Sequence, residues 1–114
     1  MGPFDARDWA AAGELLREDV VVEWPHTAEV IRGRANVIRV NADYPGEWRI
    51  EILGIVAAGD RVASQVRVCN GEETSWAASF FEVSGGLIRH VREFWVDAPI
   101  EPPPAWRAEY VERP

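Results

Sequence analysis

Apolar residues recur at helical spacing in two short stretches of the N-terminal half. Residues 9–17 and 34–43 each place apolar side chains along one side of a helix, and Asp8 precedes the first stretch as a candidate N-cap. A β-branched run at 20–24 lies between them and predicts a short strand. We therefore expect two short helices separated by this strand and by a loop over 26–31.

From Trp48 onward the pattern changes to the alternation that is typical of strands. The predicted strands cover 48–56, 61–69 and the two arms of a hairpin over 75–97. Two helices followed by antiparallel strands predict an α+β fold, in which a curved antiparallel sheet wraps around the short helices and leaves a cone-shaped hollow. At 114 residues we expect a single domain, residues 1–114, that ends in a proline-rich tail over 98–114.

The hairpin over 75–97 carries the main candidate for chemistry, Glu93. If Val83 pairs with Ile88, Glu93 lies opposite Ala78, and its face forms a pocket wall that contains one acid. The predicted pocket face carries Trp76, Ala78, Phe80, Val91, Glu93 and Trp95. The opposite face carries Ala77, Ser79, Phe81, Ile88, His90, Arg92, Phe94 and Val96. A bulge near the Gly85-Gly86 turn would shift the register and exchange the faces.

Composition and charge exclude several classes of function. The net charge is −7 and the 12 basic residues form no cluster, so nucleic acid is not an expected partner. No apolar run approaches the roughly 20 residues of a membrane span, and Met1–Asp5 lacks the features of a signal peptide, so we expect no membrane contact and a cytoplasmic location. Cys69 is the sole cysteine and the two histidines lie far apart, which argues against a disulfide or a metal site. No glycine-rich phosphate loop is present, and no cofactor is expected.

Five motifs in order along the chain carry a resemblance to a known family. They are Asp5–Trp9, Leu16–Pro25, Ile31–Arg34, Ser84–Ile88 and Glu93–Asp97. In this order they resemble the SnoaL-like branch of the nuclear transport factor 2-like superfamily. That resemblance implies the cone fold. It leaves the activity open, because the family includes polyketide cyclases, ketosteroid isomerases, dehydratases, epoxide hydrolases and members that only bind ligands.

The resemblance also bears on individual residues. Ketosteroid isomerases have a general-base aspartate where this chain has Trp24. The epoxide hydrolases of the family have a pocket carboxylate that Glu93 matches. They also have an arginine that Arg67 matches, and an aspartate where this chain has Cys69. The family's first helix is longer than the remnant at residues 4–7, so the hollow is more open, or residues 106–111 cover it, or the chain is shortened.

Two residues are candidates for proton transfer. Glu93 suits a general acid or base if it faces an apolar hollow, and its alternative role is a structural ion pair with an arginine such as Arg67. His26 follows Trp24-Pro25 in a loop expected at the mouth of the cone, where it would either move protons or stay solvated. The predicted ligand-binding residues are Trp24, Asn41, Tyr44, Arg67, Trp76 and Trp95.

Two kinds of function fit these residues. The first is a cofactor-independent enzyme that acts on a small hydrophobic carbonyl, hydroxyl or epoxide compound. The alternative is a non-catalytic module for ligand binding or dimerisation that uses the same hollow. We also expect a homodimer, because the face predicted to lie outside would leave an apolar patch exposed. The predicted patch consists of Ala77, Ser79, Phe81, Phe94 and Val96.

Overall fold

The computed structural model of the chain describes residues 4–99 and 101–114. The described elements, in order, are α1 (Trp9–Glu14), β1 (Leu16–Trp24), β2 (Glu29–Arg32), α2 (Arg34–Asp43), β3 (Trp48–Ala58), β4 (Arg61–Asn70), β5 (Glu73–Ser84), β6 (Leu87–Asp97) and the 3-10 helix η1 (Ala105–Tyr110). The predicted order of helices and strands is confirmed. Two predictions were wrong: residues 16–17 belong to β1 and not to the first helix, and the expected loop over 26–31 contains the start of β2.

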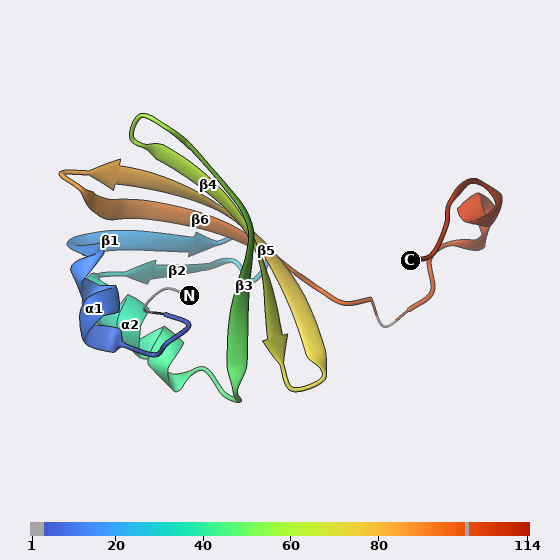
Figure 1. Cartoon of the computed structure of the whole chain (residues 1–114), viewed down its shortest axis with the longest axis horizontal. Coiled ribbons are helices and arrows are strands. Elements are labelled where there is room, and N and C mark those ends of the chain that lie inside the picture. The colour runs from blue at the N-terminus through green and yellow to red at the C-terminus, as the bar shows by residue number, and fades with distance from the viewer. Residues whose placement is uncertain (1–3, 100) are drawn as a thin grey trace.

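The strands form a single six-stranded sheet in the order β2-β1-β6-β5-β4-β3. The sheet curves strongly, and both helices lie on its concave side (Figure 1). All neighbouring strands run antiparallel except β1 and β6, which run parallel. The α+β prediction is therefore confirmed, with the correction that the sheet is mixed. The parallel pair brings β1 beside the C-terminal strand of the chain.

Local sequence signals explain where the helices begin. Asp8 caps α1 as predicted, because its Oδ1 accepts a hydrogen bond of 3.1 Å from the backbone N–H of Ala11. Gly33 precedes α2 with a φ of 88°, a conformation that glycine adopts without strain. The backbone N–H of Gly33 donates to the carbonyl of Val20 at 2.8 Å. This hydrogen bond fixes the start of α2 against β1.

The register of β5 and β6 changes one residue away from the turn. Val83 pairs with Ile88 as predicted, but Glu82 pairs with His90, so Arg89 is an extra residue on β6. This bulge shifts every later pair by one residue. The concave face carries Ala77, Ser79, Phe81, Val91, Glu93 and Trp95, and the convex face carries Trp76, Ala78, Phe80, Arg92, Phe94 and Val96. The predicted faces were correct for β6 beyond the bulge and wrong for β5.

The core lies between α2 and the concave side of β1 and β6. Its buried members are Leu16, Val20, Val22, Val37 and Val91, with Phe4, Trp24, Ile31, Ile38, Phe81 and Ile88 packed against them. Each fully buried aliphatic side chain contributes about 1.5–3 kcal/mol relative to exposure. Trp9 of α1 lies beside Trp48 at the start of β3, with ring centroids 6.4 Å apart, but residues 51–58 of β3 are all exposed. The concave side is therefore filled at the β1 end and open at the β3 end.

The proline-rich tail leaves the sheet after β6. Its last backbone hydrogen bond to the body joins the N–H of Ala98 to the carbonyl of Thr74 at 2.9 Å. Residues 101–114, here called the arm, then project away from the sheet (Figure 1). The alternative that residues 106–111 cover the hollow of their own chain is therefore wrong. The stiffness of Pro102–Pro104 accounts for this direction, since consecutive prolines favour an extended chain.

Candidate functional site

Glu93 is held on the concave face by one donor from each neighbouring strand. Ser79 lies directly opposite it on β5, and the Ser79 hydroxyl donates to Glu93 Oε2 at 2.7 Å. Trp24, at the end of β1, donates its indole N–H to Glu93 Oε1 at 3.0 Å. Glu23 of β1 pairs in parallel with Arg92 of β6. This pairing brings the next residue of each strand, Trp24 and Glu93, close together although they are far apart in the sequence. The carboxyl group is therefore fixed from both sides.

The two donors to Glu93 are both uncharged. An ionised carboxylate has about four lone-pair positions, so two hydrogen bonds leave acceptor capacity for a ligand. The Glu93 side chain is half-buried, whereas Ser79 is only 2% exposed. The described residues therefore offer an oriented carboxyl group on the concave face that is not neutralised by an arginine. Such a group can accept or return a proton.

Arg67 and Trp76 do not belong to this site. They pair with each other across β4 and β5, and the side chain of Arg67 forms an ion pair with Glu51 of β3. The predicted ion pair between Arg67 and Glu93 is thus wrong. Trp76 was predicted to line the pocket from a register without the bulge, and Arg67 was predicted from the resemblance to the epoxide hydrolases; both lie on the convex face. By contrast, Trp95 lies opposite Ala77 on the concave face and is half-buried.

The loop residue His26 lies near the site through Trp24. The ring centroids of Trp24 and His26 are 6.1 Å apart, at an angle of 49° between the ring planes. A backbone hydrogen bond of 3.2 Å from Thr27 to Trp24 closes the turn that carries His26. His26 itself is exposed, and among the described residues its ring makes no hydrogen bond to Glu93. The structure thus brings His26 beside the indole that binds Glu93 but not to the carboxyl group.

Helix α2 supplies Asn41 and Tyr44. The amide nitrogen of Asn41 donates to the carbonyl of Val37 at 2.8 Å, which leaves the amide oxygen of this half-buried side chain as a free acceptor position. Tyr44 follows the last residue of α2 and is exposed. Tyr44 therefore does not close the core, and both residues lie at the helical edge of the hollow.

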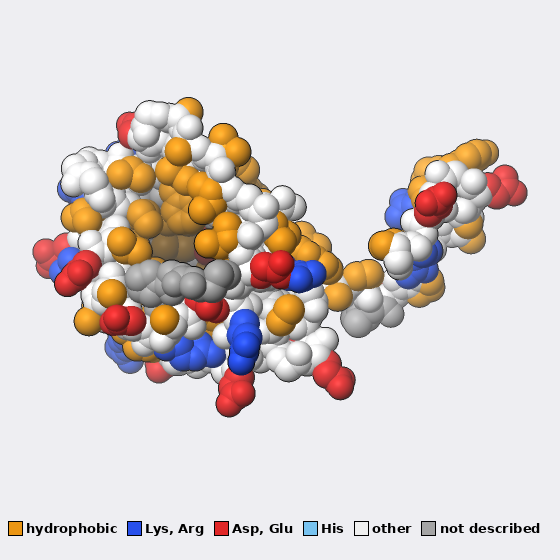
Figure 2. Space-filling model, viewed as in Figure 1, with side chains coloured by type: hydrophobic (Ala, Val, Ile, Leu, Met, Phe, Trp, Pro, Cys, Tyr) orange, Lys and Arg blue, Asp and Glu red, His pale blue; other side chains and the backbone are white. Residues whose placement is uncertain are grey.

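The open part of the hollow is apolar. Figure 2 shows a depression on this face with hydrophobic side chains along its wall. The strand register gives the other residues of this wall. On β4 they are Val62, Ser64 and Val66, which pair with Phe81, Ser79 and Ala77 of β5. On β3 they include Ile52 and Ile55. A wall of this kind suits a hydrophobic compound with one polar group directed at Glu93.

Ser79 is the site residue that sequence reasoning missed. It was assigned to the opposite face because the hairpin was continued without a bulge. One signal was present: Ser79 is a lone hydroxyl within the apolar run from Trp76 to Phe81. A polar side chain in such a run needs a hydrogen-bond partner when it is buried, and here the partner is Glu93.

A second polar cluster lies on the convex face. Glu23 Oε2 contacts His90 Nε2 at 2.6 Å and accepts a hydrogen bond of 3.1 Å from Arg92 Nη2. Two hydrogen bonds hold the pKa of Glu23 below its usual value, and the one with His90 has a larger effect than the one with Arg92. The placement of His90 on the face opposite Glu93 agrees with the prediction. This cluster is separated from the hollow by the sheet.

Residues 4–99 and 101–114 contain no group of three or more histidine, cysteine or carboxylate side chains that could hold a metal ion. Within these ranges, no helix is long and apolar enough to cross a membrane.

Known proteins share both the sequence pattern and the fold. The pattern of the SnoaL-like domain matches residues 3–91. The crystal structure of a candidate ketosteroid isomerase from Kribbella flavida DSM 17836 is 40% identical and covers 97% of this chain and 81% of that chain, with a TM-score of 0.88. An NTF2-like protein of unknown function from Burkholderia xenovorans LB400 is 21% identical, with 97% and 86% covered and a TM-score of 0.78. Both matches extend into the arm, since 97% coverage leaves too few residues to omit it.

A third structure is named for a different activity. The LEH-like epoxide hydrolase from M. tuberculosis is 21% identical and covers 82% of this chain and 74% of that chain, with a TM-score of 0.71. Among proteins with curated functions, none matches this chain. The solved structures thus share one fold and carry different names for what they do.

Proposed function

Because the chain belongs to the SnoaL-like domain family, with an NTF2-like fold, we propose that it binds a small hydrophobic compound in its hollow and acts on it by acid–base chemistry without a cofactor. The observation that carries this proposal is the pair of neutral donors that fix Glu93, at 2.7 Å from Ser79 and 3.0 Å from Trp24. A carboxylate oriented by neutral donors keeps its charge uncompensated and available to a ligand.

In the proposed reaction, Glu93 acts as the general base. It removes a proton from the substrate or from an attacking water molecule, and the resulting carboxylic acid returns a proton to the product. Ser79 and Trp24 keep the carboxylate oriented throughout. His26 is the second proposed proton carrier, while Trp24, Trp95, Asn41 and Tyr44 contact the ligand. Trp76 and Arg67 have no role in this site because they lie on the convex face.

The relatives suggest two substrate classes for a first assay. The name of the Kribbella protein favours a proton shift beside a carbonyl group, as in a ketosteroid. The name of the M. tuberculosis enzyme favours addition of water to an epoxide. An oriented carboxylate can serve either reaction, because each begins with removal of a proton. The Kribbella protein has the higher identity, so carbonyl compounds come first.

The test is the Glu93→Gln variant, assayed with small ketosteroids and with apolar epoxides. We expect kcat to fall at least about 100-fold, while KM changes only a few-fold, because glutamine keeps the shape but accepts no proton. Glu73→Gln is the matched control, since Glu73 is an exposed glutamate on the same hairpin. Turnover by Glu93→Gln within about threefold of the parent value would remove Glu93 as the general base.

A specific observation also favours a second candidate function, a ligand-binding module without turnover. Both groups that hydrogen-bond to Glu93, the Ser79 hydroxyl and the Trp24 indole, are poor proton carriers at neutral pH. In this alternative, Glu93 only accepts a hydrogen bond from a ligand hydroxyl or amine. The same compounds would then raise the melting temperature of the protein, and none of them would be converted to product.

A second copy of the chain is the proposed protein partner. The predicted contact residues need correction, because Ala77, Ser79 and Phe81 lie on the concave face. The surface now proposed is the convex patch, which consists of Trp76, Ala78, Phe80, Phe94 and Val96. Phe80 and Phe94 form an edge-to-face pair with centroids 6.1 Å apart, although they are 51% and 41% exposed. An aromatic pair this exposed suits a buried contact between two copies.

A further inference from the structure

The arm exposes large apolar side chains that contact no part of the described body. Trp106 is 75% exposed and Tyr110 is 79% exposed, and both belong to η1. Among the described residues, no hydrogen bond or ion pair joins residues 101–114 to the sheet or to the helices. Burial of these two aromatic side chains against an apolar surface would lower their free energy relative to water, so the arm is suited to a surface outside its own chain.

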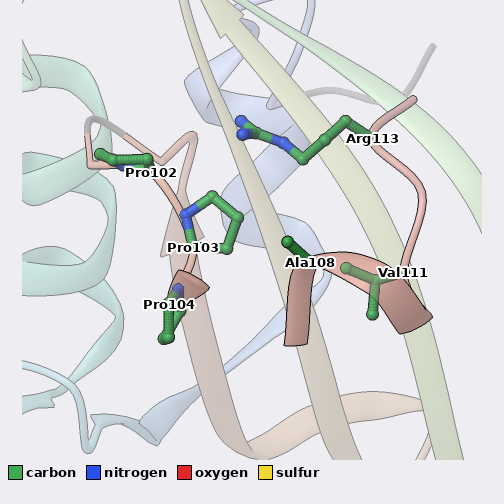
Figure 3. Close-up of a pocket in the computed structure, with 6 residues that line it drawn as sticks. All are labelled: Pro102, Pro103, Pro104, Ala108, Val111 and Arg113. Atoms are coloured by element: carbon green, nitrogen blue, oxygen red, sulfur yellow. The ribbon is translucent and has the colours of Figure 1, made fainter. Parts of the chain in front are cut away.

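The arm has a definite shape of its own. Figure 3 shows the extended prolines on one side and residues of the turn and chain end on the other, around a depression of about 170 Å³. Its lining residues are Pro102, Pro103, Pro104, Ala108, Val111 and Arg113. This volume is below the roughly 300 Å³ of a small-molecule pocket. The depression therefore reflects packing within the arm, and Trp106 and Tyr110 remain outside it.

The whole chain exposes more surface than a compact monomer of its mass. Its accessible surface is 8314 Å², whereas about 6,300 Å² is expected for 12.8 kDa. Its radius of gyration is 16.1 Å, compared with about 13 Å expected for this length. The excess of about 2,000 Å² per chain falls within the range buried by each partner in large homodimer interfaces. A second copy of the chain is therefore a partner of the right size to cover this excess surface.

We propose that in the homodimer the arm of each copy docks on the convex patch of the other copy, with Trp106 and Tyr110 as anchors. This inference rests on the proposed homodimer and adds an exchange of segments to it. The patch extends to Val96, the residue before the end of β6 at Asp97, so the chain leaves the sheet at the border of the apolar surface. The stiff prolines carry the arm away from its own patch and toward a neighbouring molecule.

Charge and symmetry agree with this arrangement. The arm carries Glu109 and Glu112 beside Arg107 and Arg113, and the patch is bordered by Arg61 and Arg92, which pair with Glu82 and Glu23 of their own chain. Acidic side chains on the arm can thus meet arginines at the rim, where such pairs mainly select the partner and its orientation. Two-fold symmetry repeats the arm–patch contact, so each dimer contains two. The assembly closes and does not propagate into a fibre.

The first experiment measures the dimer dissociation constant by sedimentation equilibrium. We expect the full chain to be a dimer at micromolar concentration. We expect Trp106→Ala and Tyr110→Ala each to weaken the dimer about 30-fold, and removal of residues 99–114 to weaken it further. Tyr44→Ala is the matched control, because Tyr44 is an exposed aromatic residue far from the arm, and this variant should keep the parent dissociation constant.

The second experiment tests exchange by complementation. One variant carries Trp106→Ala and Tyr110→Ala, and the other carries Phe80→Ser and Phe94→Ser, so that each alone loses both arm–patch contacts. A mixture can form a heterodimer that retains one intact contact, and the mixture should dimerise more tightly than either variant alone.

Three outcomes would contradict the exchange of arms between the two copies. An arm that folds back on its own chain would give no gain on mixing. A truncated chain with the parent dissociation constant would overturn the exchange while the proposed homodimer stands. A full chain that stays monomeric at about 100 μM would overturn both, since stable interfaces of this area associate well below that concentration.

Discussion

The hydroxyl of Ser79 donates to Oε2 of Glu93 at 2.7 Å, from the position directly opposite on the neighbouring strand. This contact exists only because Arg89 is an extra residue on β6. Without the bulge, Ala78 would lie opposite Glu93 and would offer no hydrogen bond. One inserted residue thus determines whether the carboxyl group is oriented.

We predict that Ser79→Ala destabilises the protein by about 1–3 kcal/mol and lowers turnover with any accepted substrate. Alanine removes the donor from a site that is 2% exposed, so water does not readily replace it at Oε2. Urea unfolding and steady-state kinetics measure the two effects. Ser64→Ala is the control, because Ser64 pairs with Ser79 from β4 and has no described hydrogen bond to Glu93. Equal losses in the two variants would contradict a specific role for Ser79.

We predict that Trp24→Phe weakens the orientation of Glu93 while leaving the aromatic ring in place. The variant loses the indole N–H that donates to Oε1 at 3.0 Å, at a cost of about 1–2 kcal/mol of unfolding free energy. Combined with Ser79→Ala, the losses should not add, because both residues bind the same carboxyl group. A double-mutant cycle by urea unfolding measures this coupling. Additivity within about 0.3 kcal/mol would indicate that the two donors act independently.

We predict that Glu23 contributes to the acid sensitivity of the protein. Its pKa is lowered in the folded state by the hydrogen bonds with His90 and Arg92, so the unfolded chain binds the proton more readily. Its contribution to stability is therefore fully present above the ordinary value of 4.5 and is lost as pH falls through the lower folded pKa. Unfolding free energies of Glu23→Gln should depend less on pH below 4.5 than those of the parent. An unchanged pH slope would disprove this contribution, and Glu73→Gln serves as the reference.

We predict that Val20→Ala lowers the unfolding free energy by about 2–3 kcal/mol. Val20 is fully buried between β1 and α2, so the substitution removes two methyl groups and leaves a cavity. Val30→Ala, at an exposed position of β2, should change the unfolding free energy by less than about 0.5 kcal/mol. Chemical denaturation of both variants gives the comparison. Similar losses would mean that the core does not lie where the structure places it.

The sequence predicted the element types well because helical and alternating patterns differ clearly here. The Asp8 cap, the hairpin turn and the Val83–Ile88 pair were all accessible from local signals. The bulge was not, because β5 is apolar on both faces. Alternation therefore could not distinguish a face with Trp76 and Phe80 from one with Ala77 and Phe81. The face assignments of Trp76 and Ser79 failed for this reason.

Long-range pairing was the other missing information. The parallel contact of β1 with β6 joins segments separated by most of the chain, and no turn between them fixes their register. The Trp24–Glu93 hydrogen bond depends on that contact and was not predicted. β2 was missed because Glu29–Arg32 is a short, largely exposed edge strand with little apolar pattern.

The bulge at Arg89 sets the register of the end of β6 against β5. If the bulge were lost and Arg89 paired regularly with Glu82, Arg92, Phe94 and Val96 would turn into the hollow and Glu93 and Trp95 would turn out, with no change in the sequence. The chemistry of the cavity and the character of the outer surface would switch together in one step. The same side chains can therefore line either the hollow or the outer surface, depending only on whether Arg89 has a partner on β5.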